Sequence, residues 1–171
     1  SGVVAAWTSI SSTIYLKSDG TLWGMGGNPN KILQNINQSK ILKPVRIASG
    51  VSNAALGDNH LIYLDLNGTL WGRGRNLNGE LGQPVGNEYR DPVVIISGGV
   101  TDLVAGNYFS AVLLVDGRIL TFGNNEFGQL GTGDLIWTRT PKKVPGLRVK
   151  HAAANTNGTY FVDLNDSLWS V

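Results

Sequence analysis

An internal repeat of 48 to 49 residues constrains this chain more than any other feature of its sequence. The segment DGTLWGMG at Asp19 returns as NGTLWGRG at Asn67, as DGRILTFG at Asp116 and in part at Asn165, with spacings of 48, 49 and 49 residues. Two landmarks far from this segment keep the same spacings, namely the prolines 44, 92 and 141 and the asparagines 28, 76 and 125. The chain is therefore an array of one supersecondary unit.

Each unit holds four short apolar segments that are typical of strands. In the first unit we expect strands near residues 3–8, 13–18, 21–26 and 45–48, recurring at the stated spacings. Asp-Gly or Asn-Gly joins the second segment to the third, and these dipeptides suit a two-residue hairpin because both central residues need positive φ. The shared proline comes just before the fourth segment, which fits the start of an outer strand with one unpaired edge.

The fold class that follows is all-β. With 23 glycines and 15% charged residues, the composition favours short strands and tight turns, and we expect almost no helix. Four antiparallel strands repeated in tandem make the blades of a β-propeller. We predict a single propeller segment over residues 1–171, with repeats at approximately 1–48, 49–97, 98–146 and a truncated 147–171, which gives three full blades and a partial fourth.

Two segments carry a resemblance to a known family. GNNEFGQLG at Gly123 and GRNLNGELG at Gly74 resemble the regulator-of-chromosome-condensation repeat, in which a W/F-G-x-N step leads to G-Q-L-G. The first repeat departs from this pattern, because Lys31 to Gln34 reads KILQ, and we expect its loop to take another path. The family's G-x-x-H step occurs once, at Gly57 to His60, and we interpret His60 as part of a structural motif rather than as a catalytic base.

The resemblance implies a propeller that binds a protein partner. Regulation of a small GTPase by nucleotide exchange, inhibition of an enzyme and carbohydrate binding stay open as alternatives, because fold alone does not choose among them. The Leu-Trp-Gly-x-Gly wording and low charge are similar to bacterial extracellular members, so a secreted or cell-surface setting is expected.

Composition argues against several other functions. The chain has no cysteine, two histidines and no recognisable nucleophile or metal-ligand spacing, so we expect neither an enzyme nor a cofactor. Its net charge of +2 is spread over 14 Lys and Arg without a basic stripe, which disfavours nucleic-acid binding. No apolar run is long enough to cross a membrane, so membrane insertion is not expected.

One face of the propeller is predicted to bind the partner. Antiparallel connectivity places the first turn of each blade and its long third loop at the same end of the strands, and the long loops differ between repeats, whereas the hairpins at the other end are uniform. Aromatic residues and arginine anchor most protein interfaces. The candidate partner-binding residues on this face are Tyr89, Arg90, Trp137, Arg139, Asp58, His60 and Tyr108.

The number of blades in this chain leads to a further expectation. Propellers of the resembling family are seven-bladed, so this chain is either a fragment of a longer propeller or one of two copies that close a ring of about seven blades. Trp7 occupies a position that Ala55, Val104 and Ala153 hold in the other repeats. We expect the chain to self-associate, with Trp7 near the contact.

Overall fold

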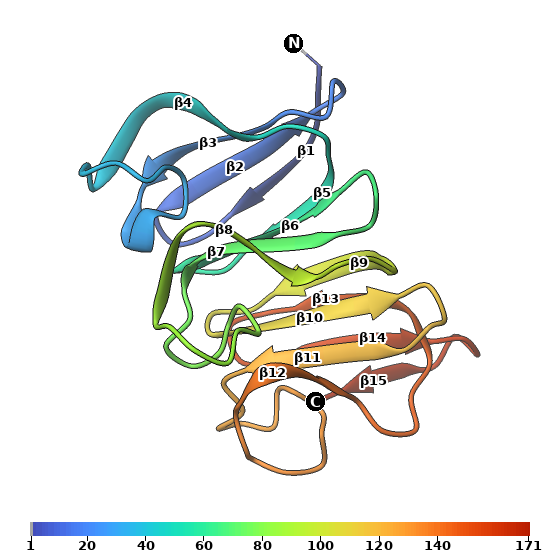
Figure 1. Cartoon of the computed structure of the whole chain (residues 1–171). Helices are drawn as coiled ribbons and strands as arrows, with labels where there is room; N and C mark the ends of the chain where they lie inside the picture. The colour runs from blue at the N-terminus through green and yellow to red at the C-terminus, as the bar shows by residue number, and fades with distance from the viewer. Residues whose placement is uncertain (1) are drawn as a thin grey trace.

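The computed structural model describes residues 2–171 as four antiparallel sheets stacked along one direction (Figure 1). Blade 1 contains β1 (Val3–Thr8), β2 (Ser12–Lys17), β3 (Leu22–Gly27) and β4 (Lys40–Ala48), and blade 2 contains β5 (Val51–Leu56), β6 (His60–Asp65), β7 (Leu70–Arg75) and β8 (Glu88–Ile96). Blade 3 contains β9 (Val100–Ala105), β10 (Phe109–Leu114), β11 (Ile119–Gly123) and β12 (Thr138–Lys143), and blade 4 contains β13 (Val149–Ala154), β14 (Thr159–Asp163) and β15 (Leu168–Ser170).

The predicted fold class is confirmed. Neighbouring strands of every sheet follow each other in the chain and pair antiparallel, as in propeller blades. Within residues 2–171 the structure has one helical element, a single 3₁₀ turn at Pro29–Lys31. The first three strands of blade 1 begin within one residue of their expected starts, because the hairpin dipeptide and the apolar alternation fix them from both sides.

The outer strands differ from the prediction. β4 begins at Lys40, before Pro44, so the proline lies inside the strand rather than at its start. The ladder passes from Gly26↔Ile41 to Gly24↔Val45, which leaves three residues of β4 opposite one residue of β3. The proline occupies this bulge, where it has no ladder bond to break, on a strand whose other edge is free. Pro92 and Pro141 sit at the same irregularity in blades 2 and 3.

The core lies between blades rather than inside them. Leu22 and Ile14 of blade 1 pack with Leu61 and Tyr63 of blade 2, and Trp71 covers the edge of this cluster. Equivalent clusters fill the spaces between blades 2 and 3 and between blades 3 and 4. Burial of apolar surface in these three layers holds the blades together, at roughly 25 cal/mol for each Å².

The two outer faces of the stack differ from the internal ones. Val51, Val100 and Val149 are at most 3% exposed where a preceding blade covers them, whereas Val3 at the equivalent position is 55% exposed. On the opposite side, Leu22, Leu70 and Ile119 are fully buried by a following blade, whereas Leu168 is 71% exposed. The same interface thus occurs three times within residues 2–171, and its two complementary halves are uncovered at the ends of the stack.

Candidate functional site

The long loops lie at the same end of the blades as the first turns, as the topology predicts (Figure 1). This loop face consists of the turns 9–11, 57–59, 106–108 and 155–158 together with the loops 28–39, 76–87 and 124–137. The opposite end, called the hairpin face below, carries the turns between the second and third strands.

One buried asparagine organises each long loop. The Asn76 Oδ1 atom accepts from the Leu81 N–H at 3.0 Å, and its Nδ2 atom donates to the Gln83 and Gly86 carbonyls, both at 2.9 Å. Asn28 and Asn125 bind the N–H of Leu33 and Leu130 in the same way, at 3.0 and 2.9 Å. Each asparagine thus ties the start of its loop to a fully buried leucine further along it. The residues at the tip of the loop make none of these contacts, so their sequence can differ between blades.

The loop of blade 1 keeps more of this path than its sequence suggested. Asn28 makes the shared contacts, and Lys31 adopts a φ of 60°, where blades 2 and 3 have Gly79 and Gly128 at 89° and 82°. An L-residue in this region costs roughly 1–2 kcal/mol. The missing glycine is thus tolerated as backbone strain. The loop still takes another path in part, as expected, because Asn30 also has a positive φ of 48° and Gln34 lacks the positive φ that Gly82 and Gly131 adopt.

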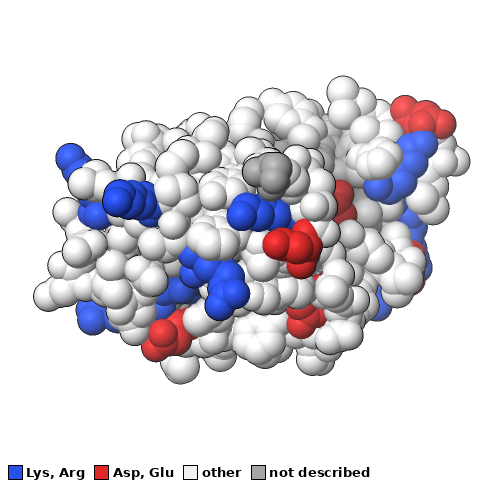
Figure 2. Space-filling model, turned by 90° about the horizontal axis from the view of Figure 1, so that it is seen from above, with Lys and Arg blue, Asp and Glu red and all other residues white. Residues whose placement is uncertain are grey.

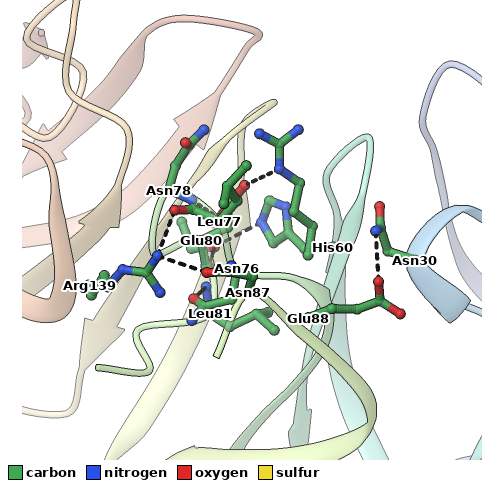
Figure 3. Close-up of polar contacts among 12 residues, drawn as sticks. Asn30, His60, Asn76, Leu77, Asn78, Glu80, Leu81, Asn87, Glu88 and Arg139 are labelled. Atoms are coloured by element: carbon green, nitrogen blue, oxygen red, sulfur yellow. Dashed lines mark hydrogen bonds and ion pairs between the residues drawn. The ribbon is translucent and has the colours of Figure 1, made fainter. Parts of the chain in front are cut away.

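His60 does not face a partner, because its side chain is fully buried between blades 2 and 3 (Figure 3). Its Nε2 atom lies 3.0 Å from the Ser110 Oγ atom, and the Ser110 hydroxyl donates to the Glu80 carbonyl at 2.8 Å. Since the single hydroxyl proton goes to that carbonyl, Nε2 must carry a proton and donate to Ser110. Burial, with the positive charge of Arg75 adding to it, lowers the pKa of His60 to about 4. The prediction that His60 binds the partner was therefore wrong. Its burial agrees with the interpretation of His60 as a structural residue.

The glycine of the G-x-x-H step has a matching structural role. A Cβ atom at Gly57 would lie 2.3 Å from the His60 ring, and one at Gly106 would lie 2.0 Å from the Phe109 ring. Where the aromatic residue is replaced by Ser12 or Gly158, the glycine is replaced as well. The step is therefore a packing motif in which an aromatic ring lies on a bare backbone.

A buried ion pair supports the loop of blade 2. The Glu80 carboxylate accepts from the Asn78 N–H at 2.8 Å and lies 3.2 Å from the Arg75 Nε atom, and burial raises the pKa of Glu80. The Arg75 guanidinium also stacks 4.9 Å from the centre of the half-buried Tyr108 ring. In blade 3 the equivalent pair is Asn124 and Gln129, whose side chains hydrogen-bond at 2.8 Å.

The other candidate residues fall into two groups. Tyr89 is half-buried against the core of blades 2 and 3, and its hydroxyl donates to the Val85 carbonyl, so it shapes the loop from inside. Trp137 is 50% exposed and Arg90 is exposed. Arg139 and Asp58 are partly exposed on the same face. The structure thus leaves Trp137, Arg90, Arg139 and Asp58 as surface candidates, with Tyr108 beside them.

Sequence reasoning missed the largest apolar contribution to this face. Phe127, Leu135 and Ile136, all in the loop of blade 3, are 61–67% exposed. Their positions in blade 2 hold Asn78, Gly86 and Asn87. At the positions of Phe127 and Ile136, the change from asparagine to an apolar residue is the signal that finds them.

The loop face has a recess of about 250 Å³ lined by the four first turns, with the polar residues Ser9, Asp58, Asn107 and Asn155 beside apolar ones. Below it, Trp7 lies with Ala55, Val104 and Ala153 around the opening between the inner strands. Trp7 packs against the cluster shared by blades 1 and 2, so it points toward blade 2 and away from the outer face of blade 1.

The described residues offer little for chemistry. Although Ser110 and His60 are hydrogen-bonded, both are fully buried, so a substrate has no access to them. In residues 2–171 no cluster of three His, Cys, Asp or Glu side chains is placed to hold a metal ion, and no helix is long and apolar enough to span a membrane. On the side seen in Figure 2, charged residues form isolated spots rather than a basic stripe.

Comparison with known proteins identifies the repeat. Two profiles described as the regulator of chromosome condensation (RCC1) repeat match residues 116–162 and 100–129. The E3 ubiquitin-protein ligase MYCBP2 of Danio rerio is 33% identical over 82 residues, which are 45% of this chain and 2% of that protein.

Solved structures agree on the fold. Human WBSCR16 superposes with a TM-score of 0.84 at 15% identity, over 98% of this chain and 47% of its own. Prp20p of Saccharomyces cerevisiae, described with binding properties to Gsp1p and histones, gives 0.84 at 19% identity, over 98% and 43%. The chain thus spans less than half of these propellers. The bacterial, extracellular setting expected from the sequence stays a prediction.

Proposed function

This chain belongs to the RCC1 repeat family, and we propose that it is a protein-binding module whose partner docks on the loop face. The observation that carries the proposal is the contrast between a uniform scaffold and dissimilar tips. A buried asparagine accepts a hydrogen bond from the N–H of a buried leucine in all three loops, while the tip of blade 3 exposes Phe127, Ile136 and Trp137. Exposed apolar and aromatic side chains on a rigid support lose little entropy on binding, which is how interface anchors work.

The experiment compares two matched double variants of the 171-residue chain as baits in quantitative affinity capture. Phe127→Ala with Trp137→Ala removes large exposed side chains from the loop face, and Leu66→Ala with Val115→Ala removes apolar side chains that are at least as exposed from the hairpin face. We expect the first variant to lose specific captured proteins at least about tenfold and the second to keep them. Equal loss with both variants, or loss with the hairpin variant alone, contradicts the proposal.

The identity of the captured protein separates the alternatives. A small GTPase whose bound nucleotide exchanges faster in the presence of the chain supports the regulator function, and an enzyme that loses activity supports the inhibitor function. Capture that soluble oligosaccharide competes away supports carbohydrate binding.

We also propose that the isolated 171-residue chain pairs with a second copy. The support is the repeated blade interface, whose complementary halves are exposed at Val3 and at Leu168. The sequence predicted this contact near Trp7. We now propose that it forms at the faces bearing Val3 and Leu168, since Trp7 points toward blade 2. Light scattering over a concentration series should show a dimer that Leu168→Asp dissociates and that Leu42→Asp, at an 87% exposed residue of β4, leaves intact. A monomer of 18.3 kDa at all concentrations refutes this proposal.

A further inference from the structure

Arg139 is a fixed cation on the loop face, and its hydrogen bonds within residues 2–171 go to uncharged acceptors. Its Nη1 atom donates to the Gly86 carbonyl at 2.9 Å. Its Nη2 atom donates to the Leu77 carbonyl at 2.9 Å and to the Asn87 Oδ1 atom at 3.1 Å (Figure 3). The side chain therefore bridges from blade 3 to the loop of blade 2. A guanidinium has five N–H donors, so two remain for a ligand.

The charge of Arg139 is not neutralised by a direct partner. Across residues 2–171 no ion pair joins it to a carboxylate. The nearby Glu80 carboxylate is buried and lies 3.2 Å from Arg75. Glu80 is thus paired with Arg75, and the partly exposed Arg139 keeps an uncompensated positive charge.

Apolar surface adjoins this cation on both sides. The half-exposed Trp137 ring has its centre 5.7 Å from the guanidinium carbon, and Leu77, whose carbonyl holds Arg139, is 48% exposed. Leu135 and Ile136 continue the apolar surface along the loop. A ligand that fits here carries a negative charge next to an apolar group.

The equivalent position in blade 2 provides an internal contrast. Arg90 lies one repeat before Arg139, and its Nε atom is paired with the Glu88 carboxylate at 2.8 Å. Glu88 occupies the position of Trp137. Blade 2 therefore neutralises its own arginine at the place where blade 3 presents an arginine and an indole.

We propose that Arg139 and Trp137 bind an acidic peptide segment of the partner, in which an Asp or Glu side chain stands next to an apolar residue. The carboxylate accepts from the free guanidinium N–H groups, and the apolar neighbour packs on Trp137 and Leu77. Charge-assisted hydrogen bonds of this kind are about twice as strong as neutral ones. A peptide suits the site better than a nucleic acid, because phosphate backbones require a stripe of cations and this cation is single. The inference rests on the proposed function and specifies the partner's chemistry.

Fluorescence anisotropy with labelled probes tests this inference. The first probe is a fluorescein-labelled peptide containing Leu-Asp-Phe-Asp, the second replaces both aspartates by asparagine, and the third is a labelled single-stranded oligonucleotide. We expect the acidic peptide to bind about tenfold more tightly than the asparagine peptide, with affinity that falls as salt rises. Arg139→Gln and Trp137→Ala should each weaken it by about tenfold. Arg118→Gln, at a partly exposed arginine of the hairpin face that is paired with Asp116, should leave it unchanged.

Several results overturn the inference. They are equal binding of the two peptides, unchanged binding by both the Arg139→Gln and the Trp137→Ala variants, tighter binding of the oligonucleotide, and no binding of the acidic peptide at millimolar concentration. Thermal melting of each variant controls for loss of the loop. If the loop-face variants still lose the captured protein while the peptides fail, the proposed function stands and only the chemistry assigned to the partner is wrong.

Discussion

At the scale of single residues, His60 shows how a repeat motif is converted into packing. The imidazole lies on the bare backbone of Gly57 and hydrogen-bonds Ser110 of the next blade. In the next repeat Phe109 takes its place over Gly106, so an apolar ring satisfies the same space. The residue contributes to stability through burial in the neutral form, and this makes its contribution depend on pH.

The pH dependence of folding should therefore change in the His60→Phe variant. The unfolded chain takes up a proton at this residue near its ordinary pKa of 6.5, whereas the folded chain does so only near pH 4. Between these values the unfolded state binds more protons, so the free energy of unfolding falls as the pH is lowered from 6.5 to 4, by at most about 1.4 kcal/mol per pH unit.

Urea denaturation across this pH range measures the effect. The wild type and the His60→Phe variant share Glu80 and Arg75, so the difference between their pH profiles isolates the histidine. Parallel profiles for the two proteins would show that His60 titrates normally in the folded state.

Lys31 is one of three non-glycine residues in residues 2–171 with a positive φ, together with Asn30 and Asp166. Glycine relieves the positive φ that Lys31 adopts. We expect Lys31→Gly to raise the free energy of unfolding by about 1 kcal/mol in urea denaturation, from the cost of a left-handed L-residue. Lys40→Gly, in the extended strand β4, is the matched control and should lower it by roughly 0.5–1 kcal/mol. A loss of stability in both variants would contradict the account of strain.

At the scale of the elements, each long loop is a replaceable tip on a fixed clamp. Asn76 satisfies one buried N–H and two carbonyls of its loop through a single side chain. We expect Asn76→Ala to lower the free energy of unfolding by about 3 kcal/mol, because it leaves those groups without partners in a buried site. Hydrogen exchange of the Leu81 amide should speed up in the same variant, whereas the Leu33 and Leu130 amides keep their protection.

The support beneath the loop of blade 2 offers a second test at this scale. Blade 3 replaces the Arg75 and Glu80 pair by Asn124 and Gln129. Arg75→Asn alone leaves a buried carboxylate without its cation and should destabilise the fold by about 3 kcal/mol. Adding Glu80→Gln should restore most of the loss, since the two amides can then pair as they do in blade 3. A double-mutant cycle by urea denaturation measures the coupling, and simple additivity would contradict it.

The elements were predictable to different degrees for physical reasons. The strands follow from local patterns, since alternation and the Asp-Gly or Asn-Gly turns specify them within one repeat. The start of β4 was not predictable in this way, because a proline in a bulge and a proline at a strand end look alike in the sequence. The burial of His60 depends on Ser110, which lies 50 residues further along the chain. Contacts between blades cannot be predicted from the sequence pattern of a single repeat.

The candidate site was predictable as a face but not as a set of side chains. Topology alone places the long loops together, and the surface residues Trp137 and Arg139 follow from that. Phe127 and Ile136 were passed over, although they replace polar residues of the previous repeat. Comparing the repeats position by position for changes in polarity, rather than for identity, finds them.

At the scale of the whole molecule, we propose that the loop face of blades 2 and 3 binds a protein. Hydrogen exchange of the chain with its captured partner tests this most directly, because the opposite hairpin face provides the control within one sample. We predict that the partner protects amides in residues 76–90 and 124–139 and leaves the hairpins at 65–69 and 114–118 unchanged. Protection confined to the hairpins, with both long loops exchanging as in the free chain, would contradict it.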